Sequence, residues 1–184
     1  MSYSNGYLKV ILGSMFSGKT TELIRIYNRY KACDISACVI NHSLDKRYHS
    51  SKLSSHNKQM IESINCVKLM DVLPTEVKKS NIFIINEGQF FNDLTISVQY
   101  LLYHKKTVYV CGLDGDYKRE KFGQMLDIIP LCDDVVKLKG ICNRCKQDDA
   151  IFTHRTTVDN NHQILVGDNI YKALCRKCYY CLNN

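Results

Sequence analysis

The sequence predicts an α/β protein in which helices flank a parallel β-sheet, followed by a small C-terminal module. Short apolar runs alternate with helical patterns over the first 136 residues. A glycine-rich turn follows the first apolar run, and from about Gly140 the alternation gives way to pairs of cysteines. Strands interleaved with helices are typical of a parallel sheet covered on its faces. We therefore divide the chain into two domains, residues 1–139 and 140–184.

Apolar runs predict four strands, and three-and-four spacing predicts two helices. The first strand covers 7–12 and ends at Gly13, and others cover 37–40, 81–85 and 107–112. The run at 81–85 is almost wholly apolar, as in a strand buried on both faces. Helices are expected over 20–30 and from Leu94 to about 102. Residues 42–60 are polar without a sustained period, and we interpret them as a long loop.

Composition fits a folded protein but does not identify a partner. The chain has 184 residues, of which 45% are hydrophobic, enough for one core and a small appended module. The net charge of +7 suits an anionic partner, such as a nucleotide or nucleic acid, or simply a soluble surface. No apolar run approaches the roughly 20 residues of a membrane helix, and no signal peptide is visible. We expect a cytoplasmic protein that binds no membrane.

The segment 13–20 reads Gly-Ser-Met-Phe-Ser-Gly-Lys-Thr and matches the phosphate-binding pattern G-x-x-x-x-G-K-[ST]. Its glycines let backbone N–H groups turn towards phosphate oxygens, and the following helix adds its positive N-terminal end. We expect Lys19 to neutralise the β- and γ-phosphates and the Thr20 hydroxyl to ligate Mg²⁺. The whole segment is expected to bind ATP or GTP: Gly13, Ser14, Met15, Phe16, Ser17, Gly18, Lys19 and Thr20.

Glu87 follows the buried strand at 81–85. In open α/β sheets the carboxyl ends of the strands face the ligand crevice. A carboxylate at that edge can take a proton from an acceptor hydroxyl or help to hold a metal. The alternative is an acidic residue that only stabilises the start of the next helix.

Two cysteine pairs, Cys142-x-x-Cys145 and Cys175-x-x-Cys178, are separated by 29 residues. Two such turns close a tetrahedral Cys₄ site, whose zinc would be structural because no coordination position stays open. A redox CxxC is an alternative, although a second pair argues against it. A nucleic-acid-binding zinc ribbon is another, since residues 137–184 carry eight basic and four acidic side chains. We interpret Cys181 as a free thiol.

Five segments, in order, resemble the type II thymidine kinases. They are the glycine-rich segment 13–20, Asn-Glu-Gly-Gln-Phe-Phe at 86–91, Gly-Leu-Asp-Gly-Asp-Tyr-Lys-Arg-Glu-Lys-Phe at 112–122, Val-Lys-Leu-Lys-Gly-Ile-Cys at 136–142 and Tyr-Lys-Ala-Leu-Cys-Arg-Lys-Cys-Tyr at 171–179. The resemblance covers nearly the whole chain. It implies a P-loop sheet with a zinc-binding lasso, and ATP-dependent 5′-phosphorylation of thymidine and deoxyuridine in deoxynucleotide salvage. It also implies a homotetramer that thymidine triphosphate inhibits and that binds no nucleic acid.

The resemblance implies roles for individual residues as well. Glu87 would be the general base that acts on the 5′-hydroxyl. The ATP site would gain Asp45, Lys46, Arg47, Asn86 and Gln89. The nucleoside pocket would have aromatic and apolar walls, which suit a flat pyrimidine ring, and a lasso that reads the base edge with backbone groups. Its residues would be Phe90, Leu113, Tyr117, Phe122, Thr153, His162, Gln163, Ile164, Leu165, Val166 and Tyr171. Single members of this set can instead be core residues beneath a loop.

Two positions depart from the family pattern. Tyr117 stands where Phe is common. Asn86 stands where Asp usually precedes the glutamate and where a carboxylate can hold a water on Mg²⁺. Asn keeps an acceptor oxygen but no charge, so we expect a higher Mg²⁺ requirement, which Asn86→Asp would lower. The alternative is that Asn86 caps the following turn.

Two other functions remain open from the residues alone. One is a P-loop ATPase whose zinc module binds nucleic acid, and the other is a non-catalytic nucleotide-binding or regulatory protein. Monophosphate formed from ATP and a nucleoside would favour the kinase, whereas ATP hydrolysis stimulated by DNA would favour the ATPase.

Overall fold

The protein is built on a six-stranded sheet, as seen in a computed structural model that describes residues 5–44, 52–54, 60–157, 163–165 and 170–183. The strands of this sheet are β1 (Tyr7–Gly13), β2 (Ala37–His42), β5 (Ile64–Cys66), β6 (Ile82–Ile85), β7 (Thr107–Gly112) and β8 (Asp134–Leu138). They lie in the order β5-β2-β6-β7-β1-β8, and every pair is parallel. The carboxyl ends of all six strands therefore lie at one edge of the sheet.

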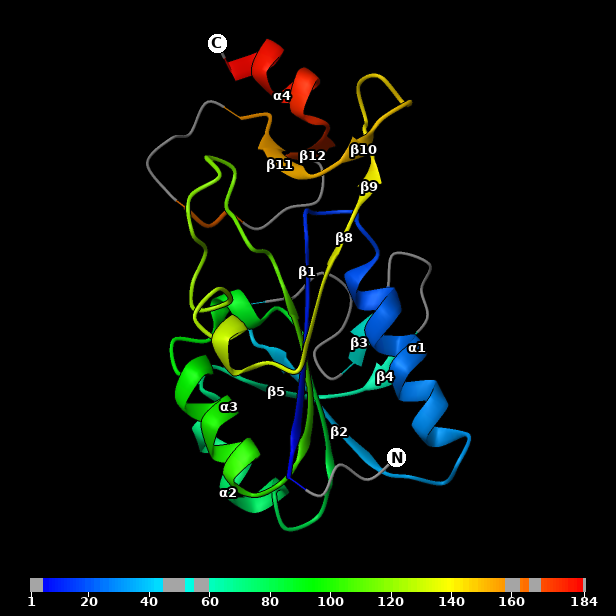
Figure 1. Ribbon diagram of the computed structural model, residues 1–184, viewed down its shortest axis with the longest axis vertical. Coiled ribbons are helices and arrows are strands. Elements are labelled where there is room, and N and C mark those ends of the chain that lie inside the picture. Colours follow the sequence, from blue (N-terminus) through cyan, green and yellow to red (C-terminus); the bar gives the residue numbers. More distant parts are fainter. Residues whose placement is uncertain (1–4, 45–51, 55–59, 158–162, 166–169, 184) are drawn as a thin grey trace.

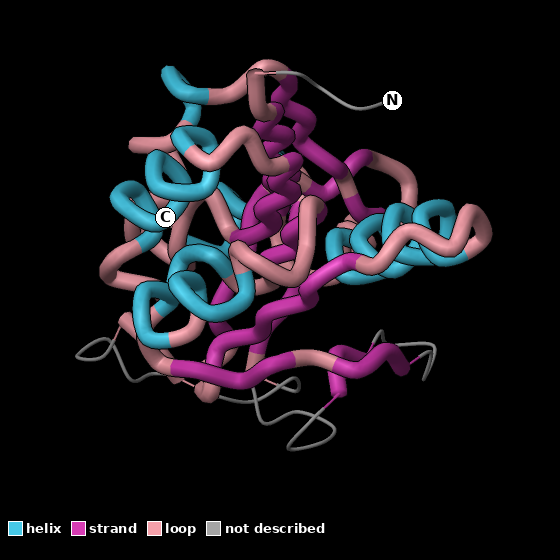
Figure 2. The backbone as a smooth tube through the Cα atoms, turned by 90° about the horizontal axis from the view of Figure 1, so that it is seen from below, coloured by secondary structure: helices cyan, strands magenta, loops and turns pink. Residues whose placement is uncertain are grey.

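Helices cover both faces of the sheet (Figures 1 and 2). The helix α1 (Lys19–Lys31) packs on one face, and α2 (Leu73–Glu76) and α3 (Leu94–Tyr103) pack on the other. Side chains alternate between the two faces of β1, so this strand contributes to both cores. Leu8 and Val10 pack in the core on the α3 side, and Ile11 packs in the core on the α1 side. Three short 3₁₀ turns complete this part of the chain: η1 (Leu69–Asp71), η2 (Gly88–Phe90) and η3 (Ile129–Leu131).

A small module follows β8 and lies beyond the carboxyl edge of the sheet (Figure 1). It contains two antiparallel pairs, β9 with β10 and β11 with β12, and a final helix. The bounds are β9 (Gly140–Ile141), β10 (Asp149–Ala150), β11 (Phe152–Arg155), β12 (Tyr171–Leu174) and α4 (Arg176–Asn183). Its own core is small and includes four cysteines together with Ala150, Leu174 and Tyr179. The module therefore covers the edge at which a parallel sheet binds its ligands.

The predicted α/β class is confirmed, and the predicted strands and helices are present with ends moved by at most two residues. The loop expected over 42–60 is wrong in part, because β3 (Lys52–Ser54) pairs in antiparallel fashion with β4 (Met60–Glu62). The strands β5 and β8 and the short helix α2 were not predicted. Among the described residues, no helix is long and apolar enough to cross a membrane. The division at 139/140 stays a prediction, and β9 begins at Gly140.

Candidate active site

The glycine-rich turn connects β1 to α1 at the carboxyl edge of the sheet. Gly13 has φ 152, and a Cβ there would lie 2.5 Å from Ser17 Oγ and 2.6 Å from the Leu138 carbonyl oxygen. Only glycine fits at this position. Gly18 has φ 85, a left-handed conformation that glycine adopts without strain, and α1 begins at the next residue. The turn therefore presents the N-terminus of a 13-residue helix to the cavity in front of it.

Lys19 is the first residue of α1, and its side chain reaches back to the turn. Its side chain is 8% exposed, and its Nζ donates a hydrogen bond of 2.7 Å to the Ser14 carbonyl oxygen. A buried ammonium beside a helix N-terminus favours an anion such as a phosphate. Seven consecutive residues line the cavity: Met15, Phe16, Ser17, Gly18, Lys19, Thr20 and Thr21. Gly13 and Ser14, also predicted to bind the nucleotide, are not part of this lining.

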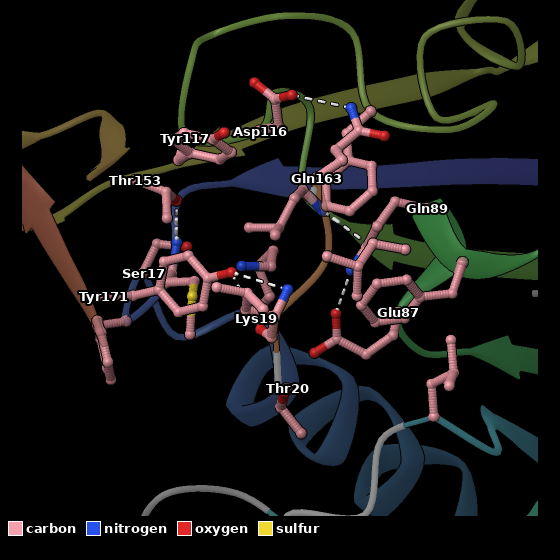
Figure 3. Close-up of a pocket in the computed structure, with 18 of the residues that line it drawn as sticks. Ser17, Lys19, Thr20, Glu87, Gln89, Asp116, Tyr117, Thr153, Gln163 and Tyr171 are labelled. Carbon is pink, nitrogen blue, oxygen red and sulfur yellow. Dashed lines mark hydrogen bonds between the residues drawn. The ribbon is translucent and has the colours of Figure 1, made fainter. Parts of the chain in front are cut away.

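Glu87 faces the same cavity from the carboxyl end of β6 (Figure 3). It is 7% exposed and has φ 53, a left-handed conformation that is uncommon for a residue with a side chain. Gln89 Nε2 donates to Glu87 Oε2 at 2.5 Å, and Gln89 Oε1 accepts the Leu113 N–H at 3.0 Å. Gln89 therefore orients the carboxylate and ties it to the end of β7. A carboxylate held in this way can accept a proton from a hydroxyl group in the cavity.

Aromatic and apolar side chains form the wall beside Glu87. Phe90 and Phe122 pack edge to face with ring centroids 5.7 Å apart. Leu113 and Tyr117 also line the cavity, so all four predicted wall residues come together. The cavity can enclose a flat ring next to the carboxylate.

The C-terminal module forms the opposite wall. Five residues that the family resemblance assigns to a nucleoside pocket line the cavity: Thr153, Gln163, Ile164, Leu165 and Tyr171. Thr153 Oγ1 also accepts the Met15 N–H at 3.0 Å, which joins the module to the phosphate loop (Figure 3).

Arg155 supports this wall from behind. It is 5% exposed, and its Nη2 donates to the Gln163 carbonyl oxygen at 2.6 Å and to the Tyr171 hydroxyl at 3.0 Å. Its guanidinium lies 3.7 Å from the centroid of the Tyr117 ring, which places a cation over a ring of the pocket. Arg155 thus holds pocket residues from three segments.

Asn86 does not line this cavity. It is 1% exposed, its Nδ2 donates to Asn41 Oδ1 at 2.8 Å, and its Oδ1 accepts the Cys111 thiol at 3.1 Å. The side chain therefore lies between β2 and β7, inside the sheet edge, where we expected it at the ATP phosphates. It makes no side-chain cap to the following turn either, since the residue at that N-cap is Glu87.

Five predicted residues lie outside the described part of the chain: Asp45, Lys46, Arg47, His162 and Val166. Three cavity residues were not predicted: Thr21, Leu44 and Asp116. Asp116 belongs to the segment 112–122 that carries the family resemblance, so its position in that segment was an available signal.

The four paired cysteines converge in the C-terminal module. The sulfurs of Cys142, Cys145, Cys175 and Cys178 all lie within 4.8 Å of one another, and those of Cys145 and Cys175 are 3.9 Å apart. Tetrahedral zinc with Zn–S bonds of about 2.3 Å separates its sulfurs by roughly 3.8 Å, so the donor set fits zinc. Burial opposes ionisation of Cys142, but backbone hydrogen bonds from Cys175, Cys145 and Arg144 lower the pKa of its thiol to about 6.

Cys181 is exposed and is not one of the four clustered cysteines, as predicted. Burial raises the pKa of the Cys38 thiol to about 12 and that of the Cys66 thiol to about 11, which suits buried cysteines that only pack.

Comparison with known proteins identifies the family of this chain. The family model described as "Thymidine kinase" matches residues 6–179. The thymidine kinase of variola virus is 38% identical over 176 residues, covering 96% of this chain and 98% of that protein. The thymidine kinase of sheeppox virus is 36% identical over 175 residues, covering 95% and 97%. The cytosolic thymidine kinase of Bos taurus is 36% identical over 179 residues, covering 97% of this chain and 74% of that protein. By these sequence matches, which span nearly its whole length, this chain belongs to the thymidine kinase family.

Proposed function

We propose that this protein transfers the γ-phosphate of ATP to the 5′-hydroxyl of thymidine, and that it also accepts deoxyuridine. One observation carries the proposal: a single cavity joins the phosphate loop to an aromatic pocket, and Glu87 faces the cavity between them. Membership of the thymidine kinase family supports the nucleoside, and the relatives named above carry this activity in their names.

In the proposed reaction the ATP phosphates lie against the backbone N–H groups of the turn and the N-terminus of α1. Lys19 neutralises the β- and γ-phosphates, and the Thr20 hydroxyl would hold Mg²⁺, which supplies further positive charge. Glu87 accepts the 5′-hydroxyl proton while the nucleoside oxygen bonds to the γ-phosphorus and the bond to the bridging oxygen of ADP breaks. Gln89 keeps the carboxylate aimed at that oxygen.

In the same proposal the base lies among Phe90, Tyr117 and Phe122, and backbone groups of 163–165 read its edge. Thymidine and deoxyuridine differ by one methyl group, which an apolar pocket distinguishes by only about 10- to 200-fold. Both are therefore expected substrates.

Several further properties rest on the family resemblance, and we propose them as such. They are a structural zinc ion on the four cysteines, a contribution of Asp45, Lys46 and Arg47 near the phosphates and of His162 and Val166 at the base, a homotetramer, inhibition by thymidine triphosphate and a role in deoxynucleotide salvage. A cytoplasmic location is proposed as well, since the bovine relative is named cytosolic.

The test is to incubate the protein with ATP, Mg²⁺ and, in separate reactions, thymidine, deoxyuridine, deoxycytidine and deoxyadenosine. Monophosphate is expected from the first two only. ATP hydrolysis that requires DNA, with no nucleoside monophosphate formed, would contradict the proposal and favour a nucleic-acid-dependent ATPase.

A further inference from the structure

A side-chain hydrogen bond closes the cavity opposite Glu87. Gln163 Nε2 donates to Asp116 Oδ2 at 2.8 Å (Figure 3). Both residues line the cavity, and they come from segments 47 residues apart in the sequence. Asp116 is 6% exposed, so this contact to a carboxylate is shielded from water.

The other oxygen of Asp116 fixes the direction of the carboxylate. Oδ1 accepts the N–H groups of Lys118 at 2.8 Å and Glu120 at 2.9 Å. The backbone N–H of Asp116 donates to the Glu120 carbonyl oxygen at 2.9 Å, which closes the turn. Three short contacts within one loop therefore leave Oδ2 aimed at Gln163.

The segment 163–165 is held from two sides. Arg155 and Tyr171 belong to β11 and β12 of the same module, and they bond to the Gln163 carbonyl oxygen and to both backbone groups of Leu165. Asp116 lies on the loop that follows β7, so its bond to Gln163 joins the segment to the sheet. This contact lies on the lining of the cavity in which the nucleoside is proposed to lie.

We propose that Asp116 and Gln163 are positioning residues that hold segment 163–165 over the nucleoside and thereby set the affinity for thymidine. The proposal rests on the proposed nucleoside site and adds to it a determinant, Asp116, from the opposite wall. We call the pair the Asp116–Gln163 latch. It acts on binding of the nucleoside and leaves the phosphate loop and Glu87 in place.

The groups around the latch define its electrostatic setting. Burial raises the pKa of Tyr179, and the negative charge of Asp116 adds to this while Arg119 opposes it. Lys19 and Glu87 face the same cavity. The other charged or titratable neighbours are Lys118, Arg119 and Glu120 on the loop of Asp116, Arg155 on β11, Tyr171 on β12 and Tyr179 on α4. None of the residues just named is a histidine, the side chain that ordinarily titrates near neutral pH.

The single substitution that tests the latch most directly is Gln163→Glu, because it places a second carboxylate in contact with that of Asp116. At pH 8 we expect the KM for thymidine to rise by about ten- to hundredfold, the scale of a lost hydrogen bond to a charged group. At pH 6 the KM should fall back towards the wild-type value, because two adjacent carboxylates raise one pKa and can then share a proton. The KM for ATP and kcat should stay near their wild-type values at both pH values.

The double variant Asp116→Asn with Gln163→Glu supplies the matched rescue. The new amide would keep an oxygen for the two backbone N–H groups and place its nitrogen where Asp116 Oδ2 now lies. The bond would then form with donor and acceptor exchanged, so thymidine affinity should return at pH 8. Gln99→Glu, the same exchange at an exposed position of α3, is the control for added charge and should behave as wild type at both pH values.

Each variant is measured by steady-state kinetics, by thymidine binding in calorimetry and by its melting temperature. A Gln163→Glu protein whose thymidine KM matches wild type at pH 8, or a double variant with wild-type melting temperature that stays weak, would overturn the latch. Wild-type protein that binds thymidine but does not phosphorylate it contradicts the proposed function and leaves the binding comparison intact. Wild-type protein that binds no thymidine overturns both.

Discussion

Glu87 combines a buried carboxylate with a left-handed backbone, and it is the residue on which the proposed chemistry depends. Glu87→Gln keeps the size of the side chain and can still bond to Gln89, so ATP and thymidine should bind as before. Turnover should fall by about 10²- to 10⁴-fold, the usual effect of losing a general base. Steady-state kinetics with separate binding measurements test this. Loss of ATP binding, with turnover at saturation little changed, would show that Glu87 serves the metal instead.

Asn86 calls for a prediction opposite to that based on the family pattern. Its side chain bonds to Asn41 and Cys111 inside the sheet edge, so Asn86→Asp would bury a carboxylate there. We expect a lower melting temperature and an unchanged Mg²⁺ concentration for half-maximal activity, because an uncompensated buried charge is costly. Asn28→Asp, on the exposed side of α1, controls for the charge itself. Half-maximal activity of the Asn86→Asp protein at lower Mg²⁺ would restore the metal role.

The contrast between these two residues shows what a single sequence can predict at this scale. Segment 13–20 and Glu87 were found because the signal is local, a spacing or a position after a buried strand. The orientation of the Asn86 side chain depends on Asn41, 45 residues before it, and on Cys111, 25 residues after it. The order of the strands in the sheet brings these three residues together. The contact of Asp116 with Gln163 likewise joins side chains 47 residues apart in the sequence.

At the scale of elements, prediction followed the strength of the hydrophobic pattern. The runs at 7–12, 81–85 and 107–112 are mostly apolar and mostly buried, which is the pattern of central strands. The strand β5 has three residues and, within the described part of the chain, pairs with β2 alone at the edge of the sheet, so its own sequence carries little of the signal. The strand β8 has no fully buried residue. Its sequence therefore lacks the continuous apolar run by which a central strand is recognised.

One cysteine turn follows β9 and the other lies at the start of α4, and all four cysteines belong to the core of the module. Loss of one ligand should therefore destabilise the whole module. Cys145→Ser or Cys175→Ser removes one of four ligands, so we expect less than one zinc per chain and poorly soluble protein. Cys181→Ser, three residues after the last ligand and exposed, is the matched control and should keep full zinc content. Metal analysis by mass spectrometry measures the outcome. Active wild-type protein without zinc would contradict the structural role.

At the scale of the whole molecule, both proposed substrate sites open into one cavity. A ligand with a thymine base and three phosphates can therefore occupy the nucleoside pocket and reach back to the phosphate loop. Thymidine triphosphate is expected to compete with thymidine and with ATP. Initial rates over a grid of both substrates and inhibitor test this. Inhibition that persists unchanged as thymidine is raised would refute the shared occupancy.

The hydrogen bond from the Met15 N–H to Thr153 has a consequence for how such a kinase can change its acceptor in evolution. The turn that we propose binds phosphate donates its Met15 N–H to a side chain of β11, in the module that we propose covers the nucleoside. A foreign C-terminal segment would have to offer an acceptor at the same place, or the turn would lose a backbone partner. We therefore expect new acceptor preferences to arise by substitutions within the module and not by its exchange.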